Sequence, residues 1–239
     1  MYGTKHLIIL AFCLLYIIGV SLLLQKKQVP LKIAVRLLLG VGIISESLKV
    51  CSYIIKNEAE MGGYLPKTDL PFHLCSVQIL FMILLVLSEN EKLKRVLIAF
   101  MLPTCLVGGA AALLLPTSSS LNMPVVTVQY FLYHSSIIVF SLYLYRSPEV
   151  RFTFRDYISA LLMLFGVFFA AIYINSALND YRSSINFMYV VKPPMEGLPY
   201  LNNDKGWLVY ILRYALLAVA AVSACYCKPI LAKIRKKEA

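Results

Sequence analysis

The chain alternates between long apolar runs and short polar connections, and this pattern predicts a bundle of helices. A helix rises about 1.5 Å per residue, so roughly 20 apolar residues cross the ~30 Å hydrocarbon core of a membrane. Runs of about this length lie near residues 6–24, 32–55, 70–88, 96–115, 125–145, 157–178 and 207–227. No stretch alternates as a barrel strand does, and lipid demands internally paired backbone. We therefore predict an all-α polytopic bundle of about seven transmembrane helices, with residues 1–239 as a single integral membrane domain.

The first apolar run occupies the position of a signal peptide but lacks the form of one. It is longer than the apolar part of a signal peptide, and no A-x-A-like cleavage site follows it. Gln25, Lys26 and Lys27 end the run. We interpret it as a retained transmembrane helix.

Composition agrees with the hydrophobic pattern. The chain is 60% hydrophobic and only 15% charged, which leaves too few polar residues to cover a soluble core. Lysines and arginines concentrate in every second connection and in the C-terminal tail, at Lys26, Lys27, Lys32, Lys92, Lys94, Arg95, Arg146, Arg151, Arg155, Lys228, Lys233, Arg235, Lys236 and Lys237. The positive-inside bias therefore predicts an outside N-terminus and a cytosolic C-terminus, as in a multi-pass protein of the cell membrane.

The net charge of +11 does not require a nucleic-acid partner. Aromatic residues are not interleaved with the basic residues of the loops, as they are where single-stranded nucleic acid binds. Contact with anionic lipid at the cytoplasmic face accounts for the charge, so we expect membrane lipids and no nucleic acid as partners.

The six cysteines predict neither disulfides nor a metal site. All lie in or beside apolar runs, where cysteine usually serves as a small buried hydrophobe. Cys225 and Cys227 are candidates for palmitoylation, but they lack zinc ligands at suitable spacing. We expect no metal and no cofactor.

A few ionisable or nucleophilic residues interrupt the apolar runs: Glu46, Lys49, His73, Cys75, His134 and Arg213. Each ionisable group costs at least a few kcal/mol in hydrocarbon, so such groups face the bundle interior and mark functional sites. Helical rise places His73 and Cys75 roughly 5–10 Å below the outer surface and His134 roughly 15 Å below it. The sequence therefore predicts one cavity in the outer half of the membrane.

Each of these residues also has a purely structural interpretation. A single histidine often only cross-links helices, and Glu46 with Lys49, one turn apart, forms an internal ion pair. Convergence of several such groups at one depth favours a functional cavity instead, because packing alone would use apolar residues.

Cys75 and His134 suggest a nucleophile and its base. A thiol near a helix N-terminus experiences positive backbone potential, and a histidine from another helix can accept its proton. Residues two apart point to different faces of a helix, so His73 would orient, cap or line the rim of the site unless the helix is distorted below Pro71.

The residues around these positions resemble a known family. The motifs are LPFHLCS at residues 70–76, YHS at 133–135 and NFMYVVKP at 186–193. Their order and spacing are similar to those of the YwaF-like integral membrane proteins, which include the transmembrane-protein-164 acyltransferases. The resemblance extends over nearly the whole chain.

This resemblance implies a phospholipid acyltransferase acting on membrane phospholipids and lysophospholipids. By position, Cys75 would be the acylated nucleophile and His134 its general base, with His73, Glu46 and Lys49 lining the site. Lys49 and Arg213 are suited to the lipid phosphate. Asn175, Asn179, Tyr210 and the backbone amides after Pro71 are candidate donors to the oxyanion. The compact chain looks bacterial.

Two alternatives remain open at this stage. Water in place of the lysolipid would make the same pair a lipid hydrolase, and sequence does not separate the two reactions. A non-catalytic transporter or sensor would use the polar residues as a relay. Transporters usually contain internal repeats with broken helices, and the two halves of this chain show no repeat.

Overall fold

The computed structural model describes residues 3–61, 63–116, 123–179, 185–195 and 197–238. A helix forms in each predicted apolar run, and the seven are α1 (Thr4–Lys26), α2 (Leu31–Met61), α3 (Leu74–Leu87), α4 (Glu91–Leu114), α5 (Pro124–Arg146), α6 (Phe154–Leu178) and α7 (Trp207–Cys225). The helix α8 (Cys227–Glu238) follows directly, and short 3-10 turns lie at η1 (Lys67–Asp69) and η3 (Phe187–Tyr189). Because the described residues contain no strand, the predicted all-α class is confirmed.

Five of the described helices are long and apolar enough to cross a membrane: α1, α4, α5, α6 and α7. Helix α3 is also apolar, but its 14 residues extend only about 21 Å, which is less than the ~30 Å hydrocarbon core. Helix α2 is long, but several charged residues interrupt its apolar surface. Seven spans therefore stay a prediction, because α2 and α3 do not meet these criteria.

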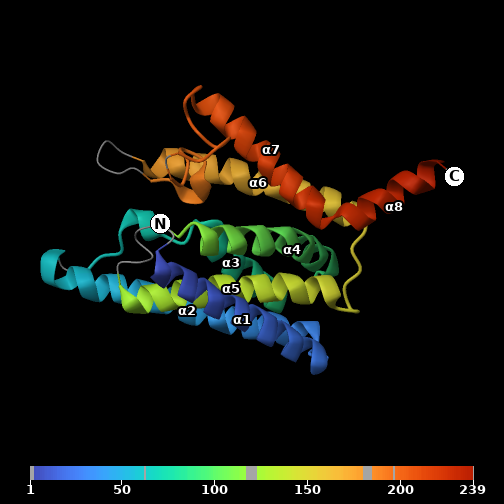
Figure 1. Ribbon diagram of the computed structural model, residues 1–239, viewed down its shortest axis with the longest axis horizontal. Helices are drawn as coiled ribbons and strands as arrows, with labels where there is room; N and C mark the ends of the chain where they lie inside the picture. Colours follow the sequence, from blue (N-terminus) through green and yellow to red (C-terminus); the bar gives the residue numbers. More distant parts are fainter. Residues whose placement is uncertain (1–2, 62, 117–122, 180–184, 196, 239) are drawn as a thin grey trace.

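Helix α5 occupies the centre of the bundle and packs against α1, α2 and α4. Helix α4 also packs against α3, α6 and α7, which joins the two groups of helices seen in Figure 1. In that view α6 and α7 lie above the other helices, and α8 extends away from the bundle toward the C-terminus. The largest cluster of buried apolar side chains lies between α2, α3, α4 and α5.

The outward faces of the helices are apolar. Large side chains on three different helices are more than half exposed, namely Phe12 at 69%, Leu162 at 68% and Leu216 at 62%. So large an apolar surface is unfavourable in water but favourable against lipid chains. The fold is therefore suited to a membrane, in agreement with its composition.

Local sequence signals explain where several helices begin. The Asn90 side chain accepts the backbone N–H groups of residues 92 and 93 at the start of α4. Thr153 and Asp156 form a reciprocal capping box at the start of α6, and Pro124 is the first residue of α5. Each arrangement satisfies or removes backbone donors that a helix leaves unpaired at its N-terminus.

Helix α3 begins at Leu74, which corrects the predicted start near residue 70. Thr68 belongs to the 3-10 turn η1 and does not cap α3. Beyond Pro71, the Phe72 N–H bonds back to the Leu70 carbonyl at 2.8 Å, and this tight turn keeps the chain out of the helix. The helix consequently starts just before Cys75, and His73 is its N-cap residue.

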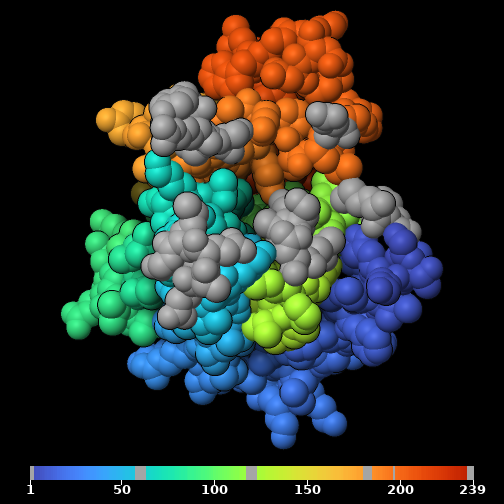
Figure 2. Space-filling view, turned by 90° about the vertical axis from the view of Figure 1, so that its left-hand side faces the viewer, coloured from blue at the N-terminus to red at the C-terminus, as the bar shows by residue number. Residues whose placement is uncertain are grey.

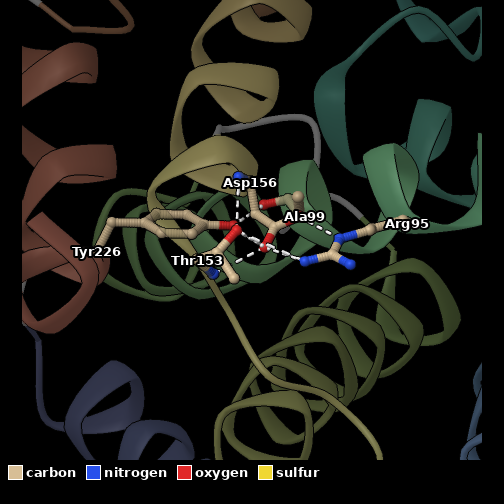
Figure 3. A network of polar contacts seen from close by, with 5 residues as sticks. All are labelled: Arg95, Ala99, Thr153, Asp156 and Tyr226. Atoms are coloured by element: carbon tan, nitrogen blue, oxygen red, sulfur yellow. Dashed lines mark hydrogen bonds and ion pairs between the residues drawn. The ribbon is translucent and has the colours of Figure 1, made fainter. Parts of the chain in front are cut away.

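A proline inside α4 leaves a backbone carbonyl unpaired, and the residue that follows α7 binds to it. Pro103 has no N–H, so it cannot pair with the Ala99 carbonyl one turn earlier. The Tyr226 hydroxyl donates to that carbonyl at 2.8 Å, and the Tyr226 side chain is fully buried. Figure 3 shows this contact beside the ion pair between Arg95 and Asp156.

Candidate functional site

The start of α3 brings a thiol to an uncapped helix end. Cys75 lies in the first turn of α3, and no side chain caps that turn. The N-cap residue His73 has an extended backbone with φ −72° and ψ 151°, so it lies outside the helix. The rule that residues two apart on a helix point to different faces therefore does not apply to His73 and Cys75. The first amides of a helix carry partial positive charge, which favours a thiolate or an oxyanion at this position.

Helix α2 contributes an ion pair to the same region. The Lys49 Nζ lies 2.7 Å from Glu46 Oε1, and the Ser76 hydroxyl donates to Glu46 Oε2 at 3.3 Å. Lys49 also lies within electrostatic reach of three side chains that the sequence singled out, His73, Cys75 and His134. The predicted internal ion pair is therefore present, and its cation acts electrostatically on the thiol and both histidines.

Helix α5 fixes the orientation of His134. The His134 Nδ1–H donates to the Tyr130 carbonyl at 2.7 Å, and the Tyr130 ring lies against the imidazole with a centroid separation of 4.2 Å. A neutral imidazole with its proton on Nδ1 has a lone pair on Nε2. His134 is only 4% exposed, and its Nε2 has no hydrogen-bond partner among the described residues. It is thus a buried, oriented proton acceptor.

Close packing of α4 against α5 also holds His134 in place. A Cβ atom added to Gly109 would lie 3.0 Å from the His134 carbonyl oxygen and 2.7 Å from the Ile138 side chain. Only glycine permits this approach without displacing α5. The backbone position of His134 therefore depends on a residue of α4.

Cys75 and His134 are not hydrogen-bonded to each other within the described structure. A hydrogen bond instead links α5 to α3, because the Tyr133 hydroxyl donates to the Cys75 carbonyl at 2.7 Å. Catalytic hydrogen bonds often tighten only when substrate binds, so this geometry is compatible with a nucleophile and base. The direct bond that the sequence suggested is absent from this conformation.

His73 contacts the loop between α6 and α7. The Met188 N–H donates to His73 Nδ1 at 3.4 Å, and the imidazole packs against the rings of Phe187 and Tyr189 at 5.3 and 5.7 Å between centroids. A neutral histidine that accepts on Nδ1 carries its proton on Nε2 and is a donor there. His73 and His134 are therefore held in opposite tautomers.

Figure 2 looks onto the end of the bundle where α3 begins. The orange residues that connect α6 to α7 lie beside the teal residues that lead into α3. Met188 and Tyr189 in this connection have φ values of 53° and 54°, which residues other than glycine rarely adopt. Such strain persists only where surrounding contacts enforce it, and it often accompanies functional sites.

Buried side chains of α6 and α7 enforce the shape of this loop. Asn175 donates to the Phe187 carbonyl at 3.0 Å and accepts the Phe187 N–H at 2.8 Å, while Tyr210 donates to the Tyr189 carbonyl. Trp207 donates to the Val190 carbonyl at 2.9 Å. These bonds fix the loop that contacts His73.

These hydrogen bonds occupy the donors of Asn175 and Tyr210, which the sequence suggested as donors to the oxyanion. The second amide hydrogen of Asn175 goes to the Ala171 carbonyl at 2.7 Å, and the single hydroxyl proton of Tyr210 goes to Tyr189. Neither side chain has a donor left for an oxyanion. Asn179 likewise binds both backbone groups of Ile185. All three position the loop.

Arg213 has partners of its own. Its guanidinium donates to Asn202 Oδ1 at 3.0 Å and to the Tyr200 carbonyl at 3.3 Å, and it lies 5.6 Å from the centre of the Tyr200 ring. Within the described chain, no hydrogen bond or ion pair links Arg213 to the start of α3. The structure therefore gathers Glu46, Lys49, His73, Cys75 and His134, and it leaves Arg213 with the loop before α7.

Sequence reasoning gave no supporting role to Ser76, Tyr133 and Tyr189, although they lie in the three motifs, and it did not single out Tyr130. Two local signals pointed to Ser76 and Tyr130. Ser76 follows the thiol directly, and Tyr130 is one helical turn before His134. In the described part of the chain, no three His, Cys, Asp or Glu side chains gather as metal ligands, and all six cysteines are free.

In a comparison with known protein families, the chain matches the TMEM164 family over residues 1–226. No curated protein and no solved structure matches the chain. The matched region contains the helices α1 to α7 and every residue of the cluster around Cys75. Together with five helices suited to crossing a membrane, the match identifies the chain as a multi-pass membrane protein that belongs to the TMEM164 family.

Proposed function

We propose that this protein is a membrane-embedded phospholipid acyltransferase in which Cys75 carries the acyl group as a thioester. The observation that carries the proposal is the gathering of a thiol, two histidines and a lysine at the uncapped start of α3. The resemblance of residues 70–76, 133–135 and 186–193 to the YwaF-like proteins implies the same activity.

The reaction needs two exchanges at one acyl carbon. In the first, the Cys75 sulfur bonds to the carbonyl carbon of a phospholipid ester, the ester C–O bond breaks, and a lysophospholipid leaves with its hydroxyl protonated. In the second, the hydroxyl of another lysophospholipid attacks the thioester, a new C–O bond forms, and the C–S bond breaks to restore the thiol. A covalent intermediate divides a difficult transfer into two easier steps.

His134 is suited to moving the proton in both exchanges. Its free Nε2 would take the proton from the Cys75 thiol and give it to the departing glycerol oxygen, then reverse these roles. His73, with its proton on Nε2, would donate a hydrogen bond to substrate oxygen. Lys49 supplies positive charge beside the thiolate and the lipid phosphate.

The first amides of α3 would stabilise the oxyanion. The backbone N–H groups at the start of a helix have no partner inside the helix, and here the N-cap side chain of His73 takes none of them. Preorganised donors of this kind typically contribute about 2.7–4 kcal/mol each to catalysis. The Cys75 sulfur would then attack the carbonyl carbon while the amides of the same helical turn bind the carbonyl oxygen.

We further propose seven spans, with the N-terminus outside and the basic C-terminal end in the cytosol of a bacterial cell. This orientation puts the start of α3 in the outer half of the membrane. Phospholipids and lysophospholipids would then reach Cys75 sideways from the outer leaflet, which requires no soluble domain.

Reconstituted protein tests the activity. We expect it to move a labelled acyl chain from phosphatidylcholine to an added lysophospholipid. Cys75→Ala should reduce transfer to background, whereas Cys105→Ala, which removes another buried thiol, should retain it. His134→Ala should slow transfer by about 10²–10⁴-fold, the usual contribution of a general base.

Two results would change this conclusion. An active Cys75→Ala protein would exclude the covalent mechanism. Release of labelled fatty acid at a rate independent of lysophospholipid would mean that water is the acceptor and that the protein is a lipid hydrolase.

A further inference from the structure

A cavity lies at the far end of α3 from Cys75. Its volume is about 700 Å³, and it is bounded by the start of α2, the end of α3, the start of α4 and the connection from α5 to α6. Leu87 lines this cavity, and the rise of α3 puts it roughly 18 Å from Cys75. The cavity is therefore distinct from the proposed acyl-transfer site.

Two of the cations in this cavity are already paired. Lys94 binds Glu91 with a separation of 2.7 Å. The Arg95 Nε and Nη2 groups donate to the two carboxylate oxygens of Asp156, at 2.6 and 2.9 Å. Asp156 is 3% exposed, and its carboxylate also accepts the N–H and the hydroxyl of Thr153, as Figure 3 shows. These acids are satisfied and would not compete for further cations.

Three other cations line the same cavity and have no ion pair or hydrogen bond in the described structure: Lys32, Arg36 and Arg151. Lys32 and Arg36 lie one turn apart on α2, and Arg151 approaches from the connection between α5 and α6. On the acidic side, Glu149 accepts the Leu31 N–H at 2.9 Å but keeps its negative charge, and Glu89 has no partner among the described residues. In the described chain, three cations without an ion pair therefore share the cavity with two carboxylates without one, so the unpaired charge is positive by one.

Arg95 adds directed donors to this positive charge. Its Nε and Nη2 are taken by Asp156 and Thr153, while its Nη1 has no partner in the described part of the chain. A guanidinium held in this way keeps its remaining N–H groups in a fixed direction, which suits a tetrahedral oxyanion. Figure 3 shows Arg95 held by this carboxylate.

Apolar side chains complete the cavity wall, and they include Val35, Leu85 and Phe152. A phosphate group with an apolar or glycerol portion matches this combination of free cations and apolar wall. We propose that this cavity binds a phosphate-bearing anion through Lys32, Arg36 and Arg151. The anion is either the headgroup of an anionic lipid or a free phosphate, and both present the same chemistry to the three cations.

Equilibrium binding to the purified full chain in neutral detergent tests the site. The probes are dioctanoyl phosphatidic acid, inorganic phosphate, zwitterionic dioctanoyl phosphatidylcholine and octanoate. We expect phosphatidic acid to bind, and competition by inorganic phosphate separates the two sources of the anion. Equal affinities for both would indicate free phosphate, and preference for the lipid would indicate a headgroup site.

A charge-matched pair of triple variants gives the control. Lys32→Gln with Arg36→Gln and Arg151→Gln should weaken binding by about tenfold or more, because it removes charge-assisted hydrogen bonds. The control carries Lys27→Gln, Lys92→Gln and Lys233→Gln, which remove equal charge from exposed residues outside the cavity. This control should change the Kd by about twofold or less, because its residues do not line the cavity and act on a bound anion only through screened, longer-range charge.

The result that would overturn the proposal is equal weakening in both triple variants, because that means general attraction to a basic surface. Absence of binding by either phosphate compound would overturn it as well, and so would equally tight binding of octanoate. All six residues are exposed, so both variants should fold, and thermal unfolding of each protein without ligand checks this. None of these outcomes depends on acyl transfer at Cys75.

Discussion

Replacing Asn175 tests how the loop between α6 and α7 is held against His73. Asn175 is 1% exposed, and its amide binds both backbone groups of Phe187. In Asn175→Ala, the Phe187 N–H and carbonyl lose these partners in a buried place. Each unsatisfied backbone group costs about 1–3 kcal/mol, so we expect the two groups together to cost the docked loop about 2–6 kcal/mol.

The single tryptophan of the chain makes this loss measurable. Trp207 donates its Nε1–H to the Val190 carbonyl in the same loop, so its fluorescence reports whether the loop is docked. A domain of this size loses about 2–4 °C in Tm per kcal/mol, so the midpoint should fall by about 4–24 °C, with a red-shifted emission. Thermal melts followed at the Trp207 emission measure both effects.

Asn175→Asp and Ser176→Ala are the informative controls. Asn175→Asp keeps the oxygen that accepts the Phe187 N–H but loses the donor to the Phe187 carbonyl, so an intermediate midpoint is expected. Ser176 is exposed, and its replacement should change little. A wild-type midpoint and emission in Asn175→Ala would refute the positioning role. If acyl transfer were then lost as well, direct contact of Asn175 with substrate would become the better explanation.

Two further predictions concern the helix packing and the orientation. Tyr226→Phe should destabilise the protein by about 1–3 kcal/mol in thermal or denaturant unfolding, because it leaves the Ala99 carbonyl unpaired. The same change should cost much less when Pro103 is first replaced by Ala, which restores a backbone donor to that carbonyl, and equal costs in both backgrounds would contradict this explanation. A cysteine at Asp204 should react with an impermeant thiol reagent on intact cells, and one at Lys92 should not, because the proposed orientation puts the basic end in the cytosol. The opposite labelling would mean that the protein has the inverse orientation.

Much of the fold follows from the sequence, because lipid imposes a simple rule on long apolar runs. Every predicted run contains a helix, and the charged or proline-containing connections separate them. The start of α3 was predicted too early, since Pro71 directs a tight turn that periodicity does not reveal. The docking of Tyr226 at Ala99 was also unpredictable, because it joins residues far apart in the chain.

The candidate site was partly predictable for the same reasons. Glu46 and Lys49 share one helix face, so their ion pair follows from spacing alone. The roles of Asn175 and Tyr210 do not follow from spacing, because their hydrogen bonds go to a loop whose path depends on packing between helices. Polar residues in apolar runs therefore indicated the cluster at the start of α3, while the hydrogen-bond partners of Asn175, Tyr210 and Arg213 required the structure.

Detection of the acylated protein tests the central claim most directly. Protein incubated with phospholipid and no lysophospholipid should accumulate an acyl group on the peptide that contains Cys75. Mass spectrometry should show this adduct, hydroxylamine should release it as a thioester, and added lysophospholipid should discharge it. The Cys75→Ala protein should carry no such group. Acyl transfer that proceeds while Cys75 stays unmodified, or an acyl group found on another residue that transfers at the rate of turnover, would contradict the account.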